Sequence, residues 1–199
     1  RNTLWTAQGT ELTPTSPVTL SWNNGAGQLF EIRLSVDENY MITAAQKVSN
    51  TGAGTVGVKP YAYISRNGIP KDPDTWTIHV GPMGVFDGAA DYDWNYDDVE
   101  DAGPKGAQFE TTGGWLGFTD KYWLTALVPD QKSPIDAAFR ASGDVYQDEM
   151  LRKTPSVIQP GKQITQRSYF FVGAKETDVL DAYQDKLGFE KFSLAIDWG

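Results

Sequence analysis

GGWLGFTDKYWLTALVP, residues Gly113–Pro129, is the stretch that decides the predicted fold. Its two apolar runs, Trp115–Phe118 and Tyr122–Val128, flank a polar turn, and each is too short for a stable isolated helix, so both are predicted to be strands. In the second run, alternate residues point to opposite faces and both sets are mostly apolar, which indicates a strand covered on both sides. Pro129 has no N–H to donate to a neighbouring strand and is expected to end this run. We therefore expect the pair to lie in the middle of a β-sandwich.

The hydrophobic pattern on both sides of this pair predicts further strands. In Phe30–Val36 apolar and polar residues alternate, and the polar turn that follows leads into Tyr40–Ser49, so these two segments are expected to form a hairpin. Gly81–Gly84 is expected to be a turn. The remaining predicted strands are Val18–Trp22, Thr55–Ser65, Thr75–Val80, Ala137–Ser142, Val145–Lys153, Ser156–Ile158 and Gln163–Val172.

One segment near the C-terminal end has the pattern of a helix. Thr177 can cap its first turn, and Gly188 stands where a left-handed residue commonly ends a helix. Such a helix most often packs its apolar face against its own domain, which is the interpretation we favour; the alternative is that the helix and the residues after it transmit or receive a contact. The residues of this face are Val179, Leu180, Tyr183 and Leu187.

The composition limits the classes of function. Of the 199 residues, 40% are hydrophobic, which is enough for a sizeable core, and one domain is expected. The net charge of −9 disfavours nucleic acid as a partner, because an acidic surface repels phosphate groups. No run of residues approaches the ~18 consecutive apolar residues of a membrane-spanning helix. The chain begins at Arg1 rather than at Met, so we expect it to be a piece of a longer protein.

Two motifs match known binding patterns only in part. Gly52–Gly57 fits G-x-G-x-x-G, but the β-branched residues and Pro60 that follow favour a strand over the helix of a dinucleotide site, so we interpret it as a hairpin turn. Asp87–Asp101 is rich in carboxylates, and its spacing resembles the first half of a calcium loop. Tyr96 and Ala102 occupy the positions where an EF-hand requires Gly and Glu, which excludes an EF-hand. A solvated acidic loop is favoured, and a looser cation site stays open.

No catalytic group stands out. His79 is the only histidine, no G-x-S-x-G motif accompanies it, and one histidine cannot supply a zinc site. The 26 Asp and Glu residues allow many carboxylate pairs, and nothing in the sequence singles out two of them for glycoside hydrolysis. We therefore predict no catalytic residue, no metal ion and no cofactor.

Five short stretches are informative because of the order in which they occur: Gly113–Trp115, Tyr122–Pro129, Val157–Gly161, Tyr169–Gly173 and Leu194–Gly199. This ordered set resembles the large periplasmic domain of YidC-type membrane-protein insertases from Gram-negative bacteria. The similarity is strongest over Gly113–Gly199, and it is weaker but collinear over Leu12–Asp101.

The resemblance implies a mainly β fold, namely a two-sheet antiparallel β-supersandwich of the galactose-mutarotase type with short C-terminal helix or helices. It implies that residues 1–199 are a single periplasmic domain of a bacterial inner-membrane protein, lacking its N-terminal strands. A helical segment at about 177–192 would lead toward the membrane. The transmembrane helices, and the intramembrane groove that carries insertase activity in this family, would lie outside this chain.

The function that the resemblance implies is non-catalytic. The domain would assist the insertion and folding of inner-membrane proteins as an interaction or scaffold module, with Sec-translocon accessory subunits and nascent membrane proteins as partners. Six residues of the C-terminal segment are expected to couple the domain to the membrane part: Val179, Leu180, Tyr183, Leu187, Phe189 and Trp198. Of these, we expect Leu180, Tyr183 and Leu187 to dock on the sandwich.

The alternative is a carbohydrate-binding module or an aldose-epimerase-like enzyme, because the implied fold is shared with such proteins. Trp94 and Trp115 are then candidates for lining a sugar-sized cleft, although burial in the core is commoner for tryptophan. Mutarotase chemistry relies on positioned histidines with a carboxylate, and a single histidine gives it little support. Likeness of fold alone does not transfer function.

Overall fold

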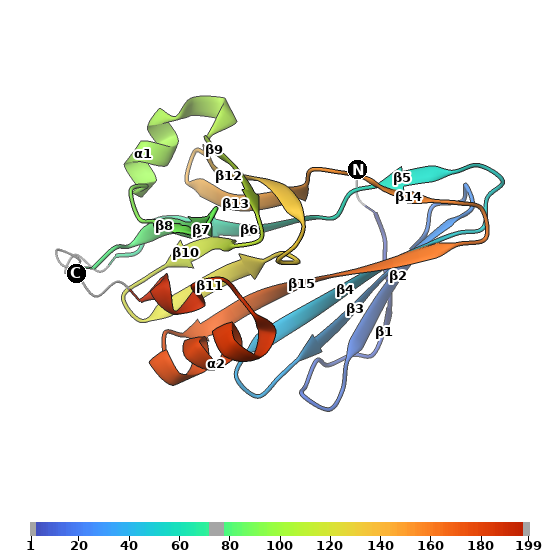
Figure 1. The fold of residues 1–199 in the computed structure, drawn as a ribbon, viewed down its shortest axis with the longest axis horizontal. Coiled ribbons are helices and arrows are strands. Elements are labelled where there is room, and N and C mark those ends of the chain that lie inside the picture. Colours follow the sequence, from blue (N-terminus) through green and yellow to red (C-terminus); the bar gives the residue numbers. More distant parts are fainter. Residues whose placement is uncertain (1–2, 72–77, 197–199) are drawn as a thin grey trace.

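The computed structural model describes residues 3–71 and 78–196, which form mainly antiparallel strands. Among them the largest feature is a nine-stranded sheet that runs through the whole molecule (Figure 1). In spatial order its strands are β1 (Thr6–Gln8), β2 (Val18–Asn23), β3 (Gln28–Val36), β4 (Met41–Asn50), β15 (Gln163–Ala174), β11 (Trp123–Val128), β10 (Trp115–Thr119), β7 (Gly81–Phe86) and β8 (Ala89–Asp91).

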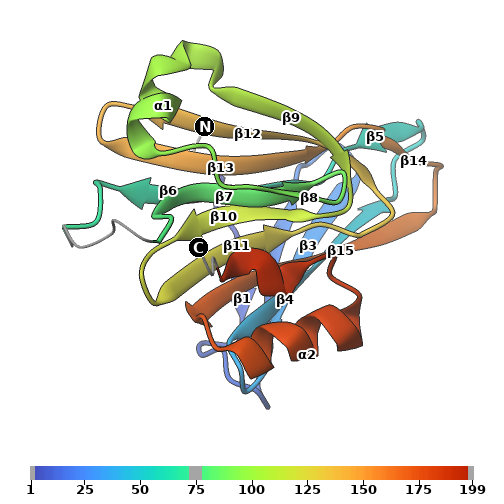
Figure 2. The same ribbon diagram turned by 60° about the vertical axis from the view of Figure 1, so that its left-hand side comes forward.

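A second, four-stranded sheet packs over the β11–β10–β7 end of the large sheet (Figures 1 and 2). Its strands, in spatial order, are β6 (Tyr61–Asn67), β13 (Val145–Arg152), β12 (Pro134–Ser142) and β9 (Ala107–Thr112). A short ribbon of β5 (Val56–Val58) and β14 (Ser156–Ile158) forms where the chain passes between the two sheets. The expected antiparallel two-sheet architecture is confirmed.

The central pair of strands is confirmed as well. β10 and β11 are antiparallel neighbours, with Leu116 opposite Leu127. Trp115 packs into a core with Phe171 on one side of the sheet, and Leu116 packs into a second core with Phe139 on the other side. Both Trp115 and Leu116 are 0% exposed, so the large sheet is covered on both faces at this point.

The C-terminal segment covers the face of the large sheet that lies away from the small sheet (Figure 2). It consists of α2 (Thr177–Leu187) and a 3₁₀ helix (Phe192–Ala195). The N-cap of α2 is Glu176, one residue before the predicted Thr177, and its side chain makes no capping hydrogen bond. Gly188 ends the helix in the left-handed conformation, with φ of 68°, as predicted.

Two predicted elements before the central pair are wrong. The strand Thr55–Ser65 is interrupted at Pro60, and its two parts join different partners, β14 and β13. The turn expected at Gly81–Gly84 is the buried strand β7 instead, and a Cβ on Gly84 would lie 2.7 Å from the carbonyl oxygen of Trp115. That glycine therefore serves the close approach of β10 rather than a turn.

Residues Thr75–Thr77 of another predicted strand lie outside the described residues, and Ile78–Val80 are not in a strand. The acidic segment Asp87–Asp101 is also more ordered than the favoured loop, because it includes β8 and α1 (Tyr96–Asp101). Asn95 and Asp98 form a reciprocal capping box at the start of α1. The carboxylates of this helix are thus partly explained by capping and by its positive N-terminal end.

The remaining predictions of extended structure are confirmed. The hairpin of β3 and β4 is present, β12 and β13 pair across a turn at Gly143, and β14 and β15 follow in the expected positions. The glycine-rich segment Gly52–Gly57 leads into β5 and not into a helix, as expected, but it does not form the hairpin turn that was predicted, because β5 pairs with β14 and not with β4. No helix within the described ranges is long and apolar enough to cross a membrane.

Candidate functional site

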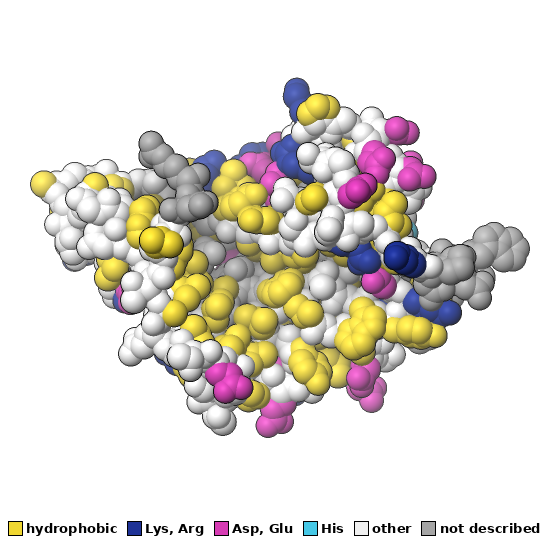
Figure 3. Space-filling view, turned by 180° about the vertical axis from the view of Figure 1, so that it is seen from behind, with side chains coloured by type: hydrophobic (Ala, Val, Ile, Leu, Met, Phe, Trp, Pro, Cys, Tyr) yellow, Lys and Arg dark blue, Asp and Glu magenta, His cyan; other side chains and the backbone are white. Residues whose placement is uncertain are grey.

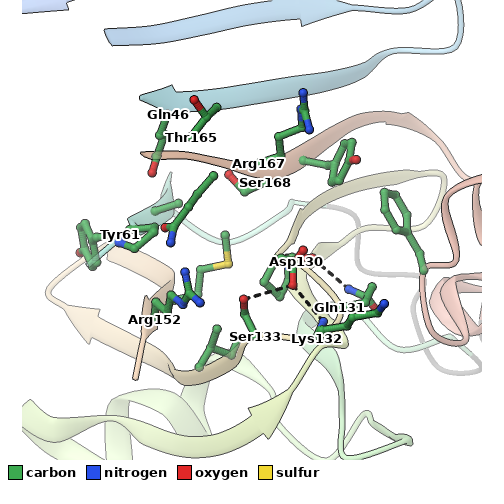
Figure 4. Close-up of a pocket in the computed structure, with 18 of the residues that line it drawn as sticks. Gln46, Tyr61, Asp130, Gln131, Lys132, Ser133, Arg152, Thr165, Arg167 and Ser168 are labelled. Atoms are coloured by element: carbon green, nitrogen blue, oxygen red, sulfur yellow. Dashed lines mark hydrogen bonds between the residues drawn. The ribbon is translucent and has the colours of Figure 1, made fainter. Parts of the chain in front are cut away.

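A cavity of about 500 Å³ lies where the small sheet meets the edge of β15 (Figure 4). Residues 165–169 of β15 line one side of this edge cavity, and Ala62 and Met150 of the small sheet line another. The loop 129–133 borders it, and Leu187 and Phe189 bring the C-terminal segment to it. Its volume falls within the range of ordinary ligand pockets.

The loop beside the edge cavity is held by its own polar side chains. The carboxylate of Asp130 accepts from the backbone N–H of Lys132 (3.0 Å) and from the hydroxyl of Ser133 (3.1 Å). The side chain of Gln131 donates to the carbonyl of Gly114 (2.9 Å) and accepts from the N–H of Glu190 (3.1 Å). The loop therefore connects the cavity to the start of β10 and to the C-terminal segment.

Gly114 explains part of the sequence signature at the start of the central pair. Its φ is 72°, and a Cβ there would lie 2.0 Å from the carbonyl oxygen of Val85. Gly113, with φ of 73°, would place a Cβ 2.6 Å from the carbonyl oxygen of Gln131. Both glycines are thus required by close backbone contact, which keeps the 129–133 loop against the sheet.

The walls of the edge cavity are more basic than the chain as a whole. Lys132, Arg152 and Arg167 line it, against Asp130, whose carboxylate is already engaged in the loop. A terminal N–H of Arg152 donates to the hydroxyl of Ser156 (3.1 Å), while the Nε of Arg152 is buried without a partner in the described structure. The cavity is therefore suited to a ligand that carries an acceptor or a negative charge.

The C-terminal segment is anchored to the sandwich by packing and by several polar contacts, among them the hydrogen bonds from the hydroxyl of Tyr92 to the carbonyl of Leu194 and from the hydroxyl of Tyr183 to Asp37. Leu180 (0% exposed), Phe189 and Tyr183 belong to the core that surrounds Trp115. The hydroxyl of Tyr183 donates to both carboxylate oxygens of Asp37, at 2.7 and 2.8 Å, in the turn between β3 and β4. Burial, with the hydrogen bond to this carboxylate, raises the pKa of Tyr183 above its ordinary value.

The six residues expected to couple the domain to a membrane part lie in different surroundings. Leu180, Tyr183 and Phe189 are buried, and Val179 is partly buried against the same core. Leu187 does not dock in the same way, because 41% of its surface is exposed and it borders the edge cavity. Trp198 lies outside the described residues.

The two tryptophans considered for a sugar cleft do not line the edge cavity. Trp115 is fully buried in the core. Trp94 is partly buried, packs against the second core and meets Phe109 edge to face, with ring centroids 6.2 Å apart. Both residues therefore serve packing between layers in this structure.

His79 does not line the edge cavity. Its Nε2 lies 2.8 Å from the carbonyl oxygen of Pro82, and its ring meets Tyr92 edge-on. Within the described ranges no group of three or more His, Cys, Asp or Glu side chains is arranged to hold a metal ion.

Several solved structures share this fold. A galactose mutarotase related enzyme from Lactobacillus acidophilus aligns over 84% of this chain and 70% of its own, with a TM-score of 0.55 and 11% identity. A galactose mutarotase-like protein from Clostridium acetobutylicum aligns over 85% of this chain and 66% of its own, with a TM-score of 0.54 and 8% identity. The fold is that of the galactose-mutarotase-like β-sandwiches, and at such identities the likeness concerns the fold alone.

The family is more specific than the fold. The model of the YidC periplasmic domain matches residues 1–199, and the chain belongs to this family. A membrane protein insertase YidC from Zymomonas mobilis is 43% identical over the whole chain, and one from Acidiphilium cryptum is 39% identical. The chain spans about a third of these relatives' length, 34% and 35% respectively. It is the periplasmic domain of a bacterial inner-membrane protein, as the resemblance implied.

Proposed function

We propose that this domain is a non-catalytic interaction module of a membrane-protein insertase, and that it assists the insertion and folding of inner-membrane proteins. The family match over the whole chain supports the insertase context. The basic lining of the edge cavity supports a binding role. Nascent membrane proteins and Sec-translocon accessory subunits are the partners that we propose.

We propose further that the C-terminal segment couples the sandwich to the membrane part. The observation that carries this proposal is the depth at which the segment is built into the core: Leu180 and Phe192 are both 0% exposed. A force on this segment is therefore transmitted to β10, β11 and β15 rather than absorbed by a loose tail. The opposite surface of α2 remains free for contact, since Asp181 and Asp185 are exposed.

The test compares two matched charge reversals in the full-length protein. Asp181→Lys with Asp185→Lys changes the exposed surface of α2, and Asp97→Lys with Asp101→Lys changes exposed residues at the same spacing on α1. Both variants should fold, because none of the four side chains is buried. We expect insertion of a substrate into membrane vesicles to fall severalfold with the α2 variant and to change little with the α1 variant. Equal insertion by both would contradict coupling through α2.

Removal of the whole segment is a less clean experiment than point changes. Deleting residues 177–192 removes Leu180, Tyr183 and Phe189 from the core, so loss of insertion would follow from unfolding as well as from lost coupling. Normal insertion after that deletion would nevertheless overturn the coupling proposal. The carbohydrate alternative is not favoured; saturable binding in a titration with a panel of sugars would restore it.

A further inference from the structure

β15 is longer than the neighbouring strand β11, and the difference leaves part of one edge open. β15 has 12 residues and β11 has six. β4 pairs with β15 over Gln163–Phe171, whereas β11 pairs with it only over Tyr169–Ala174. Among the described residues, the segment 163–168 of β15 therefore has a neighbouring strand on the β4 side and none on the β11 side.

The register identifies which backbone groups face this open edge. In an antiparallel strand, the N–H and C=O groups of successive residues point alternately to the two sides. The N–H of Val172 donates to Tyr40 on the β4 side (3.4 Å), and the N–H of Lys175 donates to Tyr122 on the β11 side (2.8 Å). Even-numbered residues of β15 thus face β4, and odd-numbered residues face the β11 side.

Thr165 and Arg167 consequently present their backbone N–H and C=O groups to the open edge, and no hydrogen bond within the described residues reaches these groups. All five residues 165–169 line the edge cavity. Because alternate side chains lie on opposite faces of a sheet, a cavity lined by five successive residues borders the edge of the strand. An unpaired edge of this kind is a template for another strand.

The wall across the edge cavity adds a charge preference. Figure 4 shows Arg152 on the far side of the cavity from β15, with Ser133 beside it. The Nε of Arg152 is buried and unpartnered, and none of the described ion pairs involves Lys132, Arg152 or Arg167. In a chain with a net charge of −9, the lining of this cavity is locally basic, which suits a carboxylate.

We propose that the open edge of β15 binds an extended, acidic segment of another polypeptide by β-strand addition. The segment exchanges backbone hydrogen bonds with Thr165 and Arg167, and one of its carboxylates lies beside Arg152. Side chains on one face of the added strand contact Leu187 and Tyr169, while those on the other enter the space between the sheets. The inference deepens the proposed function, on which it rests for the kind of partner, by naming the site and the binding mode.

The test uses the full-length protein in detergent and a fluorescent peptide of alternating Val and Thr with one central Asp. In one derivative the backbone nitrogens of the odd-numbered residues carry N-methyl groups, and in the other those of the even-numbered residues do. Each derivative therefore has a different edge of the strand blocked. We expect the parent peptide and one derivative to bind equally, and the other derivative to bind at least about tenfold more weakly. Equal binding of both derivatives, or no binding of the parent peptide, overturns the proposal.

Variants of the protein test the same contact from the other side. Thr165→Pro removes an N–H group that points to the open edge and not to β4. It should therefore abolish peptide binding while the pairing of β15 with β4 is kept. Thr165→Val is the matched control and should bind the peptide normally. Arg152→Met should remove the preference for the Asp peptide over a Lys peptide. Far-ultraviolet circular dichroism checks that each variant is folded. Unchanged binding by folded Thr165→Pro overturns strand addition.

The experiments distinguish failure of the strand-addition proposal from failure of the proposed function. Absent peptide binding together with the expected insertion defect of the α2 charge reversal would reject this site and leave the interaction role of the domain standing. Peptide binding with no insertion defect in Thr165→Pro would place the segment outside the insertion process and reject the partner that we infer.

Discussion

The two halves of the nine-stranded sheet contrast sharply in how they are covered. In β10, β11 and the adjoining part of β15, one face lies under α2 and the other under the small sheet, and Trp115, Leu116 and Phe171 are almost completely buried. β2 and β3 lie beyond the small sheet. The face of these strands on the same side as the small sheet is also apolar, but its side chains are partly exposed. Seen from behind, hydrophobic side chains form a band beside a hollow in the surface (Figure 3).

The exposed face of β2 and β3 carries a row of aromatic side chains in contact with one another. Trp22 lies opposite Phe30 in the register, and their rings stack with centroids 5.2 Å apart. Trp5 extends this aromatic row from the other side of Trp22, at 6.1 Å. An apolar surface of this kind typically marks an interaction region. One half of the sheet therefore maintains the fold, while the other half leaves an apolar face partly exposed.

The largest predicted effect compares one phenylalanine from each half. Phe171→Ala should lower the free energy of unfolding by about 3–5 kcal/mol, because it leaves a hole in a closed core. Phe30→Ala should cost roughly 1–2 kcal/mol, since Phe30 buries only part of its surface. Urea unfolding of the 199-residue chain measures both, with unchanged m-values as the control for two-state behaviour. Equal losses would remove the distinction between the halves.

A second comparison concerns the helix that closes the covered half. Leu180→Ala should destabilise the chain by about 2–4 kcal/mol, because Leu180 is 0% exposed in the core. Leu187→Ala, on the same helix, should cost no more than ~0.5 kcal/mol, because 41% of the surface of Leu187 is exposed at the rim of the edge cavity. The same unfolding experiment applies. A large loss from Leu187→Ala would mean that this residue docks after all.

The small sheet that lies over the covered half contains a buried acid. Asp148 is fully buried on β13, neither of its carboxylate oxygens has a hydrogen-bond partner in the described structure, and burial raises its pKa well above the ordinary value. Below about pH 3.9 the carboxyl is protonated in both states and the shift has no effect. As the pH rises further, only the unfolded state releases the proton, so stability falls by up to about 1.4 kcal/mol per pH unit until the raised pKa is reached.

Asp148→Asn should therefore stabilise the chain at neutral pH and remove this part of its pH dependence. The measurement is the difference in unfolding free energy between the two proteins at a series of pH values, in which the contributions of all other carboxylates cancel. The difference should be smallest in acid and grow with pH. A difference that does not vary with pH would show that Asp148 ionises normally in the folded chain.

The smallest predicted effect tests the polar anchor of α2. Tyr183→Phe removes the hydrogen bond to Asp37 and should lower stability by about 1 kcal/mol. Asp37 keeps the backbone N–H of Asn39 as a donor, which limits the loss. Tyr169→Phe is the matched control, since no hydrogen bond of its hydroxyl exists among the described residues, and it should be nearly neutral. Thermal unfolding of the three proteins resolves this difference.

Much of the strand pattern could be predicted because alternation and turn residues act locally. β3 with β4, and β12 with β13, were identifiable from runs of period two separated by short polar turns. Predictions failed where a residue serves a distant contact: Gly84 resembles a turn residue in sequence but makes room for Trp115. Leu187 has the helical spacing of a core residue, yet the small sheet and the 129–133 loop leave it at the rim of the edge cavity.

The sequence by itself determined most of the extended segments, where the helix ends, and, through the order of five short stretches, the family. Only the tertiary structure decided which faces are covered, because the layers are built from segments far apart in the chain, such as β4 and β15. The open edge of β15 was also decided by the tertiary structure. It exists because β11 ends at Val128 while β15 continues, and the sequence of one strand does not reveal the length of the strand that pairs with it.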